Sequence, residues 1–365
     1  MPNALVVGGT GPTGPFIIEG LIERGYTPII LHRGHHEVPG TRPDIEHIHA
    51  DPHFLETLQE AIGDRKFDIA IGMYGRLRFL AEALRGHADR LITVGGTVYQ
   101  NILSRPAKEE DPRWTNHNLY VRITQTEDLL MKAHEDGWFN LSHFRFPNLY
   151  GPRQLAPREW SMIRRMLDGR RKFIVLDGGL TLESRAYVEN AAYPVLLAVE
   201  KPKESAGQQY NVADEYTPSD ADRLKVTAEV MGVDIELVNF PVKAGKPGWY
   251  WGVGREMVWA MEGSPPPTEH ALLDIGKMKR ELGYHDLVDF REAMKRTVEF
   301  YVENPPERGG EEERQIGDPF DYAAEDAFIA ELEKFQERID SIDFGGISYA
   351  HPYAHPKEPE KKAKS

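Results

Sequence analysis

The sequence predicts an α/β fold, with a doubly wound parallel sheet, a smaller C-terminal substrate domain and a helical tail. Two observations lead to this prediction. Short apolar runs alternate with helical patterns through residues 1–150, which is typical of βαβ units with right-handed crossovers. The first apolar run also ends in a glycine-rich turn that leads directly into a helix, as in the first unit of a doubly wound sheet.

The first strand is expected at Ala4–Val7, and the helix after it carries Phe16, Ile17 and Leu21 at helical spacing before Gly25 ends it. Further strands of this part are expected at residues 28–31, 45–48, 67–71, 91–94 and 141–146. Helices are expected between them at residues 54–62, 77–84 and 114–134. This order predicts a dinucleotide-binding domain over residues 1–155.

After Gly151 the spacing of the apolar runs changes, which predicts a second domain. Helices are expected here at residues 160–167, 187–199, 219–232 and 288–303, and strands at 172–176 and 209–213. We expect residues 183–215 to return to the first domain, so that the substrate domain comprises residues 156–182 and 216–304. Residues 305–365 are expected to form a tail with an amphipathic helix at Ala323–Ile339 and a disordered, Pro- and Lys-rich end.

Composition excludes several kinds of function. The 365 residues include 58 acidic and 44 basic side chains, and a surface with a net charge of −14 repels phosphate backbones, so no nucleic-acid partner is expected. The chain has no cysteine, which excludes disulfides, thiolate catalysis and Cys-ligated zinc. We expect a cytoplasmic protein without a signal peptide or membrane contact, because no run approaches the ~20 apolar residues of a membrane span.

The turn Gly8–Gly14 has the spacing G-x-x-G-x-x-G between a strand and a helix. Gly8 permits the tight turn, Gly11 lets the backbone approach a pyrophosphate, and Gly14 lets the helix pack closely on the strand. The helix N-terminus presents N–H groups and a positive dipole end to the phosphates. A structural turn without a ligand is the alternative to a dinucleotide site here. The residues expected to bind the dinucleotide are Gly8, Thr10, Gly11, Pro12, Thr13 and Gly14.

The second strand ends in His32-Arg33-Gly34, where NAD sites place an acidic residue that binds the ribose hydroxyls. Arg33 can pair with a 2′-phosphate, so the sequence favours NADP. The alternative is a solvated arginine that stacks on adenine and selects neither cofactor, so that NAD stays possible. We include His32 in this cofactor site. Asp51 either accepts a hydrogen bond from the adenine or caps the helix that begins near Pro52. The dense histidines of this region are interpreted as polar surface, and no metal site is expected.

Together these residues resemble the extended short-chain dehydrogenases/reductases, the NAD-dependent epimerase/dehydratase family, over roughly residues 3–303. Beyond the glycine loop, the matching segments are Thr97–Tyr99, Arg145–Arg153 with the pattern R-x-x-N-x-Y-G-P-R, Arg185–Asn190, Tyr210–Ala213 and Asp274–Leu282. The resemblance implies a Rossmann-like sheet and an NAD(P) cofactor. It also implies a homodimer formed through the helices at about residues 76–86 and 115–134.

In that family a Ser or Thr, a Tyr, and a Lys four residues after the Tyr carry the proton transfer, and the Lys lowers the pKa of the phenol. Tyr120 matches the tyrosine, but Thr124 stands at the lysine position and Gly95 at the serine position, with Thr97 the nearest hydroxyl. The resemblance therefore implies that Tyr120 donates a proton, assisted by Thr97 or Thr124. A packed, inactive tyrosine is the alternative, because a phenol of pKa near 10 is a poor base at neutral pH.

The resemblance also assigns roles on the substrate side. It implies that Pro147 and Asn148 contact the nicotinamide and that Arg185 grips the pyrophosphate of a nucleotide-linked substrate. The alternative for Arg185 is an ion pair with the protein's own acids. Trp249 and Trp251 are expected to line an aromatic or apolar substrate pocket, unless they belong to the core or to an oligomer interface.

Three functions remain as hypotheses. The first is an NADP(H)-dependent oxidoreductase that acts on a carbonyl or hydroxyl compound. The second is a sugar-nucleotide epimerase or dehydratase that recycles a retained cofactor, which Arg185 favours and the missing lysine disfavours. The third is a non-catalytic nucleotide sensor or scaffold, which the missing serine and lysine favour.

Overall fold

The computed structural model describes most of the chain in two separate units, residues 1–321 and 322–365. The described residues are 1–34, 42, 44–99, 105–113, 115, 118–240, 270–343, 345–346, 348–353 and 357. Trp249, Trp251 and most of the Pro- and Lys-rich end therefore lie outside the described residues. The second unit contains helix α12 (Tyr322–Asp340), and no helix in the described ranges is long and apolar enough to cross a bilayer.

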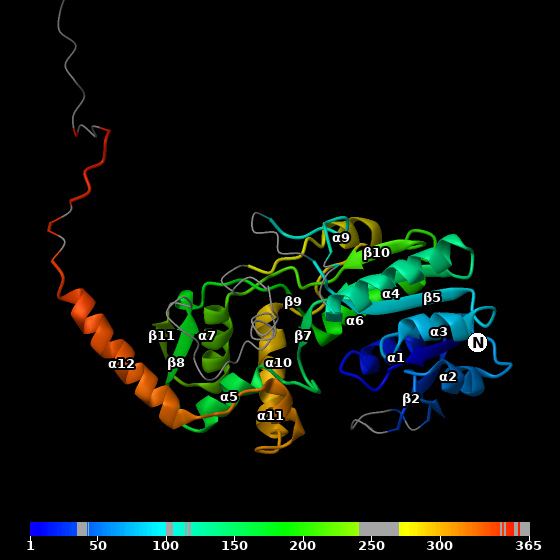
Figure 1. The fold of residues 1–365 in the computed structure, drawn as a ribbon, viewed down its shortest axis with the longest axis horizontal. Coiled ribbons are helices and arrows are strands. Elements are labelled where there is room, and N and C mark those ends of the chain that lie inside the picture. The colour runs from blue at the N-terminus through cyan, green and yellow to red at the C-terminus, as the bar shows by residue number, and fades with distance from the viewer. Residues whose placement is uncertain are drawn as a thin grey trace, which may run out of the picture. The chain divides into compact units, whose positions relative to one another are not determined.

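A seven-stranded sheet, parallel throughout, organises the first unit (Figure 1). Its strands are β1 (Asn3–Val7), β2 (Thr27–His32), β3 (Glu46–His49), β4 (Ile69–Gly72), β5 (Arg90–Gly96), β6 (Asn140–Phe146) and β10 (Gln208–Asn211). The strand order is β10-β6-β5-β4-β1-β2-β3, so the chain builds outward from β1 in one direction and then, from β4 on, in the other. The predicted doubly wound sheet is thus confirmed. Ligands of such sheets bind at the carboxyl ends of the strands where the order reverses, here between β1 and β4.

Helices cover both faces of this sheet. One face packs against α1 (Gly14–Glu23), α6 (Val188–Glu200) and α9 (Gly276–Leu282), and the other against α2 (Leu55–Ile62), α3 (Leu77–Leu84) and α4 (Asn118–Glu135). Within β1, Ala4 and Val6 pack on the first face and Leu5 and Val7 on the second, because strand side chains alternate. Burial on both faces explains why the run Ala4–Val7 is apolar without interruption.

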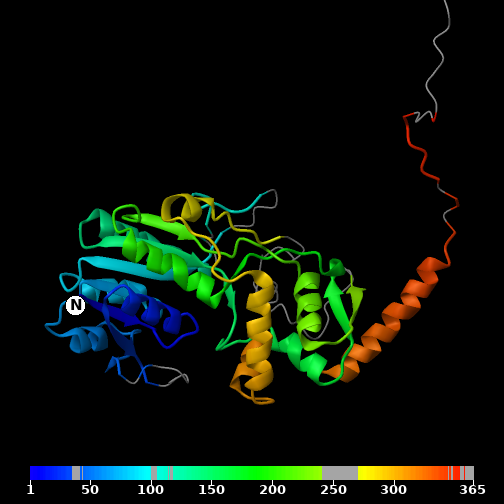
Figure 2. The same ribbon diagram turned by 180° about the vertical axis from the view of Figure 1, so that it is seen from behind.

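A smaller lobe of the first unit follows β6 (Figure 2). It contains α5 (Trp160–Leu167), β8 (Lys172–Leu176), the short helix η1 (Asp177–Gly179), α7 (Asp220–Met231), β11 (Glu236–Phe240), α10 (Phe290–Glu303) and α11 (Glu311–Ile316). Strands β8 and β11 pair with each other, and β7 (Asn148–Tyr150) pairs with β9 (Arg185–Tyr187) where the chain enters the lobe and returns from it. The short elements β7, β9, β11, α9 and α11 were not predicted, since three to seven residues show little periodicity.

The segment after α10 packs on α5 and belongs to the first unit as far as Asp321. The Trp160 indole N–H donates to Glu313 at 2.8 Å, and the Arg165 guanidinium pairs with both carboxylate oxygens of Asp318 at 2.5 and 2.9 Å. Arg165 and Asp318 are both buried. The charged run Glu311–Arg314 thus forms a helix that is anchored to the lobe.

Arg90, at the start of β5, is a buried cation held by neutral groups. Its guanidinium donates to Asn140 O and Oδ1, to the hydroxyls of Ser142 and Ser205, and to Ala198 O, at 2.8–3.1 Å. Ala198 lies in the last turn of α6, where the helix dipole is negative and stabilises a positive charge. Burial lowers the pKa of Arg90 to about 10. Arg90 therefore joins β5, β6 and α6 at the amino end of the sheet.

The variant Arg90→Met is expected to lower the free energy of unfolding by about 2–3 kcal/mol, because several buried acceptors lose their donor at once. The matched control is Arg291→Met, whose ion pair with Glu229 has both side chains about two-thirds exposed, at 67% and 64%. This control should leave the free energy of unfolding nearly unchanged, because solvent screens an exposed ion pair. Urea denaturation followed by circular dichroism measures both, and equal losses would contradict the role given to Arg90.

Candidate functional site

In the glycine loop between β1 and α1, the backbone is crowded at Gly8 and Gly14 and open at Gly11, where a ligand is expected. Gly8 has φ +89°, and a Cβ there would lie 2.5 Å from the Tyr74 Cβ. A Cβ on Gly14 would lie 1.9 Å from the Gly9 carbonyl oxygen, so this position also demands glycine. At Gly11, the one heavy atom within 4 Å of such a Cβ is the Gly8 carbonyl oxygen at 3.5 Å. The loop therefore fits a dinucleotide, with the open backbone at Gly11 and the first turn of α1 facing the pyrophosphate.

Thr10, Pro12 and Thr13 complete this loop. Thr13 is the residue before α1 and is buried, with its hydroxyl 3.8 Å from the Met73 sulfur. The Gly8 N–H donates to Leu31 O at 3.1 Å and so ties the loop to β2. The predicted glycine loop is thus held between two neighbouring strands.

At the end of β2, His32 and Arg33 lie in different environments. His32 is buried: its Nδ1 accepts from the Gly34 N–H at 3.2 Å, and its Nε2 is 2.8 Å from His47 Nδ1. Both ring nitrogens therefore have partners within the chain. Arg33 is exposed and donates to the Tyr74 hydroxyl at 2.8 Å, beside the glycine loop. Of these two residues, Arg33 is the one open to a ligand.

Asp51 lies in the turn that precedes α2, which begins at Leu55 and not near Pro52. One of its carboxylate oxygens accepts from the His53 N–H at 3.0 Å and pairs with His53 Nδ1 at 2.7 Å. Among the described residues, no group of three or more His, Cys, Asp or Glu side chains is placed to hold a metal ion.

The positions of the expected proton-transfer set lie around the ends of β5 and β6. Thr97 follows β5 and donates its N–H to Phe146 O at 3.2 Å, directly before Pro147. Tyr120 and Thr124 lie one turn apart on α4, where Tyr120 is half-buried and Thr124 is buried. Burial raises the pKa of Tyr120, so its phenol holds its proton at neutral pH. In this protonated form the phenol can donate a proton but cannot act as a base.

The His143 ring fills the space that a side chain at position 95 would need. A Cβ on Gly95 would lie 2.8 Å from the His143 Nε2 and Cε1 atoms, so no serine side chain fits there unless the imidazole moves. The Thr93 hydroxyl contacts His143 Nδ1 at 2.8 Å, and Nε2 is buried without a hydrogen-bond partner. Burial lowers the pKa of His143 to about 4, which keeps the ring neutral.

A buried ion pair between Arg145 and Glu127 connects these elements. The Arg145 Nε donates to Glu127 at 2.7 Å, and both side chains are at most 1% exposed. Arg145 also donates to the Tyr99 hydroxyl and, at 3.0 Å, to Gln209. The Tyr99 hydroxyl in turn donates to Asn211 Oδ1 at 2.5 Å. Arginine and carboxylate thus join α4, β6, β10 and the segment after β5.

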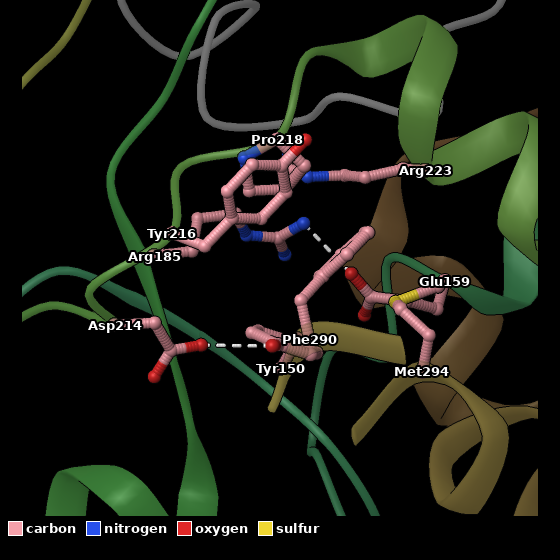
Figure 3. A pocket seen from close by; sticks show the side chains of 9 residues that line it. All are labelled: Tyr150, Glu159, Arg185, Asp214, Tyr216, Pro218, Arg223, Phe290 and Met294. Atoms are coloured by element: carbon pink, nitrogen blue, oxygen red, sulfur yellow. Dashed lines mark hydrogen bonds and ion pairs between the residues drawn. The ribbon is translucent and has the colours of Figure 1, made fainter. Parts of the chain in front are cut away.

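The expected substrate arginine, Arg185, lies beside a small cavity in the lobe (Figure 3). The cavity has a volume of about 10 Å³, which is room for about one water molecule. Arg185 donates from Nη1 to Glu159 at 2.7 Å, while its Nε and Nη2 atoms are buried and have no hydrogen-bond partner among the described residues. The predicted alternative, an ion pair with the protein's own acids, is therefore observed, but it uses only one of the guanidinium nitrogens.

Asn148 hydrogen-bonds beside this cavity, and Tyr150 and Asp214 line it. Asn148 donates to Glu183 at 2.8 Å, and Glu183 Oε2 is 3.7 Å from Arg223. Burial alone would raise the pKa of Glu183, but the nearby arginines outweigh it and lower the pKa to about 2. On the same cavity, the Tyr150 hydroxyl donates to Asp214 at 2.8 Å, and burial raises the pKa of Asp214 to about 7.

Sequence reasoning did not find Glu159, Arg223 or Asp214 as site residues. They come from the end of the turn before α5, from α7 and from the segment after β10, and no motif joins these segments. A weak signal was available for Tyr150, which lies within the quoted segment Arg145–Arg153.

Comparison with known proteins agrees with this arrangement. A model of the family described as NAD dependent epimerase/dehydratase matches residues 4–213. A dTDP-glucose 4,6-dehydratase from an Actinoplanes species is 24% identical over 239 residues, which cover 65% of this chain and 67% of that protein.

Two solved structures show the same fold. A UDP-glucose 4-epimerase from Thermotoga maritima, solved with UDP-glucose, is 19% identical, with a TM-score of 0.66 over 83% of this chain and 100% of the other. A dTDP-glucose 4,6-dehydratase from Bacillus anthracis, solved with NAD, is 17% identical, with a TM-score of 0.63 over 84% and 98%. With a family match over more than half of its length, this chain belongs to the NAD-dependent epimerase/dehydratase family of enzymes.

Proposed function

We propose that this protein converts a nucleoside-diphosphate sugar by redox chemistry, with a dinucleotide kept in the site between turnovers. The observation that carries the proposal is Arg185, which lines the lobe cavity with two buried guanidinium nitrogens that have no acceptor. Diphosphate oxygens would complete its hydrogen bonds with the bidentate geometry that arginine favours. The similarity to a dTDP-glucose 4,6-dehydratase and to a UDP-glucose 4-epimerase supports this substrate class.

The chain's own residues divide the work between binding and proton transfer. When bound along Gly8–Gly14, the dinucleotide would supply a nicotinamide that accepts hydride from a sugar carbon and returns it. Pro147 and Asn148 follow β6 at the same edge of the sheet and would border the ring. Oxidation of a sugar hydroxyl releases a proton as the hydride leaves, so Tyr120 would accept this proton as the phenolate and give it back to the sugar oxygen when the hydride returns, and the hydroxyls of Thr97 and Thr124 would orient that oxygen. The raised pKa of Tyr120 disfavours the phenolate and would slow this cycle.

A non-catalytic nucleotide sensor is the second candidate. The pair Gly95 and His143 favours it, because the imidazole fills the space of a serine side chain. Thr124 favours it too, since an uncharged side chain cannot lower the pKa of Tyr120. A net NADP(H)-dependent reductase remains a third outcome, distinguished by stoichiometric consumption of NADPH. For the cofactor itself, we propose that Arg33 selects NADP, supported by the absence of an acidic residue at the end of β2.

The variants Gly11→Ala and Gly14→Ala test the cofactor loop as a pair. Gly11→Ala should retain its fold and lose at least about tenfold in NAD(P) affinity, because the methyl group takes the space that the pyrophosphate approaches. Gly14→Ala should instead cost about 2 kcal/mol or more in stability, owing to the clash with the Gly9 carbonyl. Native mass spectrometry and thermal denaturation separate the two effects; undiminished NAD(P) binding by Gly11→Ala would contradict the site.

Cofactor choice is tested by Arg33→Ala. Loss of a charge-assisted hydrogen bond to the 2′-phosphate should weaken NADPH binding about 10- to 100-fold and leave NADH binding within about twofold. Arg65→Ala removes another exposed arginine, which pairs with Glu46, and serves as the control. Calorimetric titration with both dinucleotides measures the difference. If NADPH affinity does not change, the 2′-phosphate role of Arg33 is wrong.

Tyr120→Phe tests catalysis. Loss of the proton donor should lower the turnover of a nucleoside-diphosphate sugar by about 10²- to 10⁴-fold, while dinucleotide binding stays unchanged. The assay follows conversion of UDP- and dTDP-sugars by mass spectrometry and NMR, with bound NAD(P) determined on the same samples. A variant as active as the parent protein would remove Tyr120 from the mechanism. Binding without any turnover by the parent protein would favour the sensor.

A further inference from the structure

Arg185 and Glu159 form an ion pair that leaves much of its hydrogen-bonding capacity unused. Arg185 is 7% exposed and Glu159 is 1% exposed. A single hydrogen bond joins them, from Nη1 to Oε1 at 2.7 Å. The Nε and Nη2 atoms of Arg185 and the Oε2 atom of Glu159 are all buried without a partner. A carboxylate and a guanidinium can form two parallel bonds, and this pair does not.

The surroundings of Arg185 favour an anion over a neutral group. Arg223, 4% exposed, lines the same cavity, and Arg158 precedes Glu159 in the chain, with its Nε also buried and unpaired. Arg223 is balanced by Glu183 and Asp220, each 3.7 Å from its Nη1 atom. Glu159 is the carboxylate that hydrogen-bonds to Arg185, while Glu183 and Asp220 act on it through their charge.

Space is the second constraint on this cavity. At about 10 Å³ it is far smaller than the roughly 300–1,000 Å³ of a small-molecule pocket. A diphosphate can reach Arg185 if the Glu159 side chain withdraws. The Glu159 backbone is fixed, because its carbonyl accepts from the N–H groups of Met162 and Ile163 at 3.1 Å in the first turn of α5. Withdrawal is therefore a rotation of the side chain alone.

We propose that Glu159 is an internal counter-ion that competes with the ligand's diphosphate for Arg185, and so sets the affinity and the anion selectivity of the site. Glu159 holds the arginine in place while the site is empty, with one hydrogen bond in place of two. A diphosphate offers more acceptor oxygens and completes the guanidinium, whereas a monoanion that forms one bond gains little over the carboxylate it displaces. This role rests on the proposed function of Arg185 as a diphosphate ligand.

The test measures binding of inorganic pyrophosphate, UDP and dTDP to the full-length protein by calorimetry. Glu159→Gln keeps the shape of the side chain and removes its charge, and it should bind pyrophosphate about tenfold more tightly than the parent protein. Glu299→Gln makes the same charge change on an exposed residue of α10 and should stay within about twofold. In the double variant Glu159→Gln/Arg185→Gln the gain should disappear.

An unchanged or weaker pyrophosphate affinity in Glu159→Gln would overturn the proposal. If that variant does not fold, Glu159→Asp keeps the charge but shortens the reach to Arg185, and it should tighten binding by a smaller factor; no gain there would also overturn the proposal. The result is separable from the proposed function. Tighter pyrophosphate binding without turnover of any nucleoside-diphosphate sugar supports the counter-ion and refutes the function, and turnover with unchanged pyrophosphate affinity does the reverse.

Discussion

The buried ion pair between Arg145 and Glu127 is the interaction on which the carboxyl edge of the sheet depends. Glu127 lies on α4, the helix that carries Tyr120 and Thr124, and Arg145 lies on β6, two residues before Pro147. Because an unpaired buried charge is strongly destabilising, neither partner can move without the other. The pair thus holds α4 against the end of β6, and with it the positions of Tyr120 and Thr124 relative to Pro147 and Asn148.

Two buried arginines in this molecule show how a scaffold differs from a site. The Arg145 guanidinium donates to a carboxylate, a phenol, a backbone carbonyl and an amide, so it has hydrogen-bond acceptors on several sides. Arg185 has one acceptor and two nitrogens without any. Completed hydrogen bonds hold a structure in one state, and incomplete ones in a cavity leave free energy for a ligand to recover. Under the proposed function, the same residue type therefore serves rigidity at one place and recognition at another.

Sequence periodicity was informative where helices are amphipathic and strands are buried on both faces. The expected bounds of α3 and α5 agree with the structure, and the glycine loop has the constraints assigned to Gly8 and Gly14. The lobe site was less accessible, because Glu159 and Arg223 meet Arg185 only after the chain has turned back through β9 and α7. For His32, the sequence placed it correctly at the end of β2 but carried no sign that its ring would be enclosed by Gly34 and His47.

The shared volume of Gly95 and His143 has a consequence for how this protein can change over evolutionary time. A serine acquired at position 95 meets the imidazole, and a smaller residue acquired at position 143 leaves a void beside a glycine and a threonine without its partner. Each single step costs stability, although the two changes together restore a compatible fit. A protein that carries both residues can therefore return to a serine at position 95 only through a destabilised intermediate. This epistasis between the two positions restricts the protein to the chemistry that its present side chains allow.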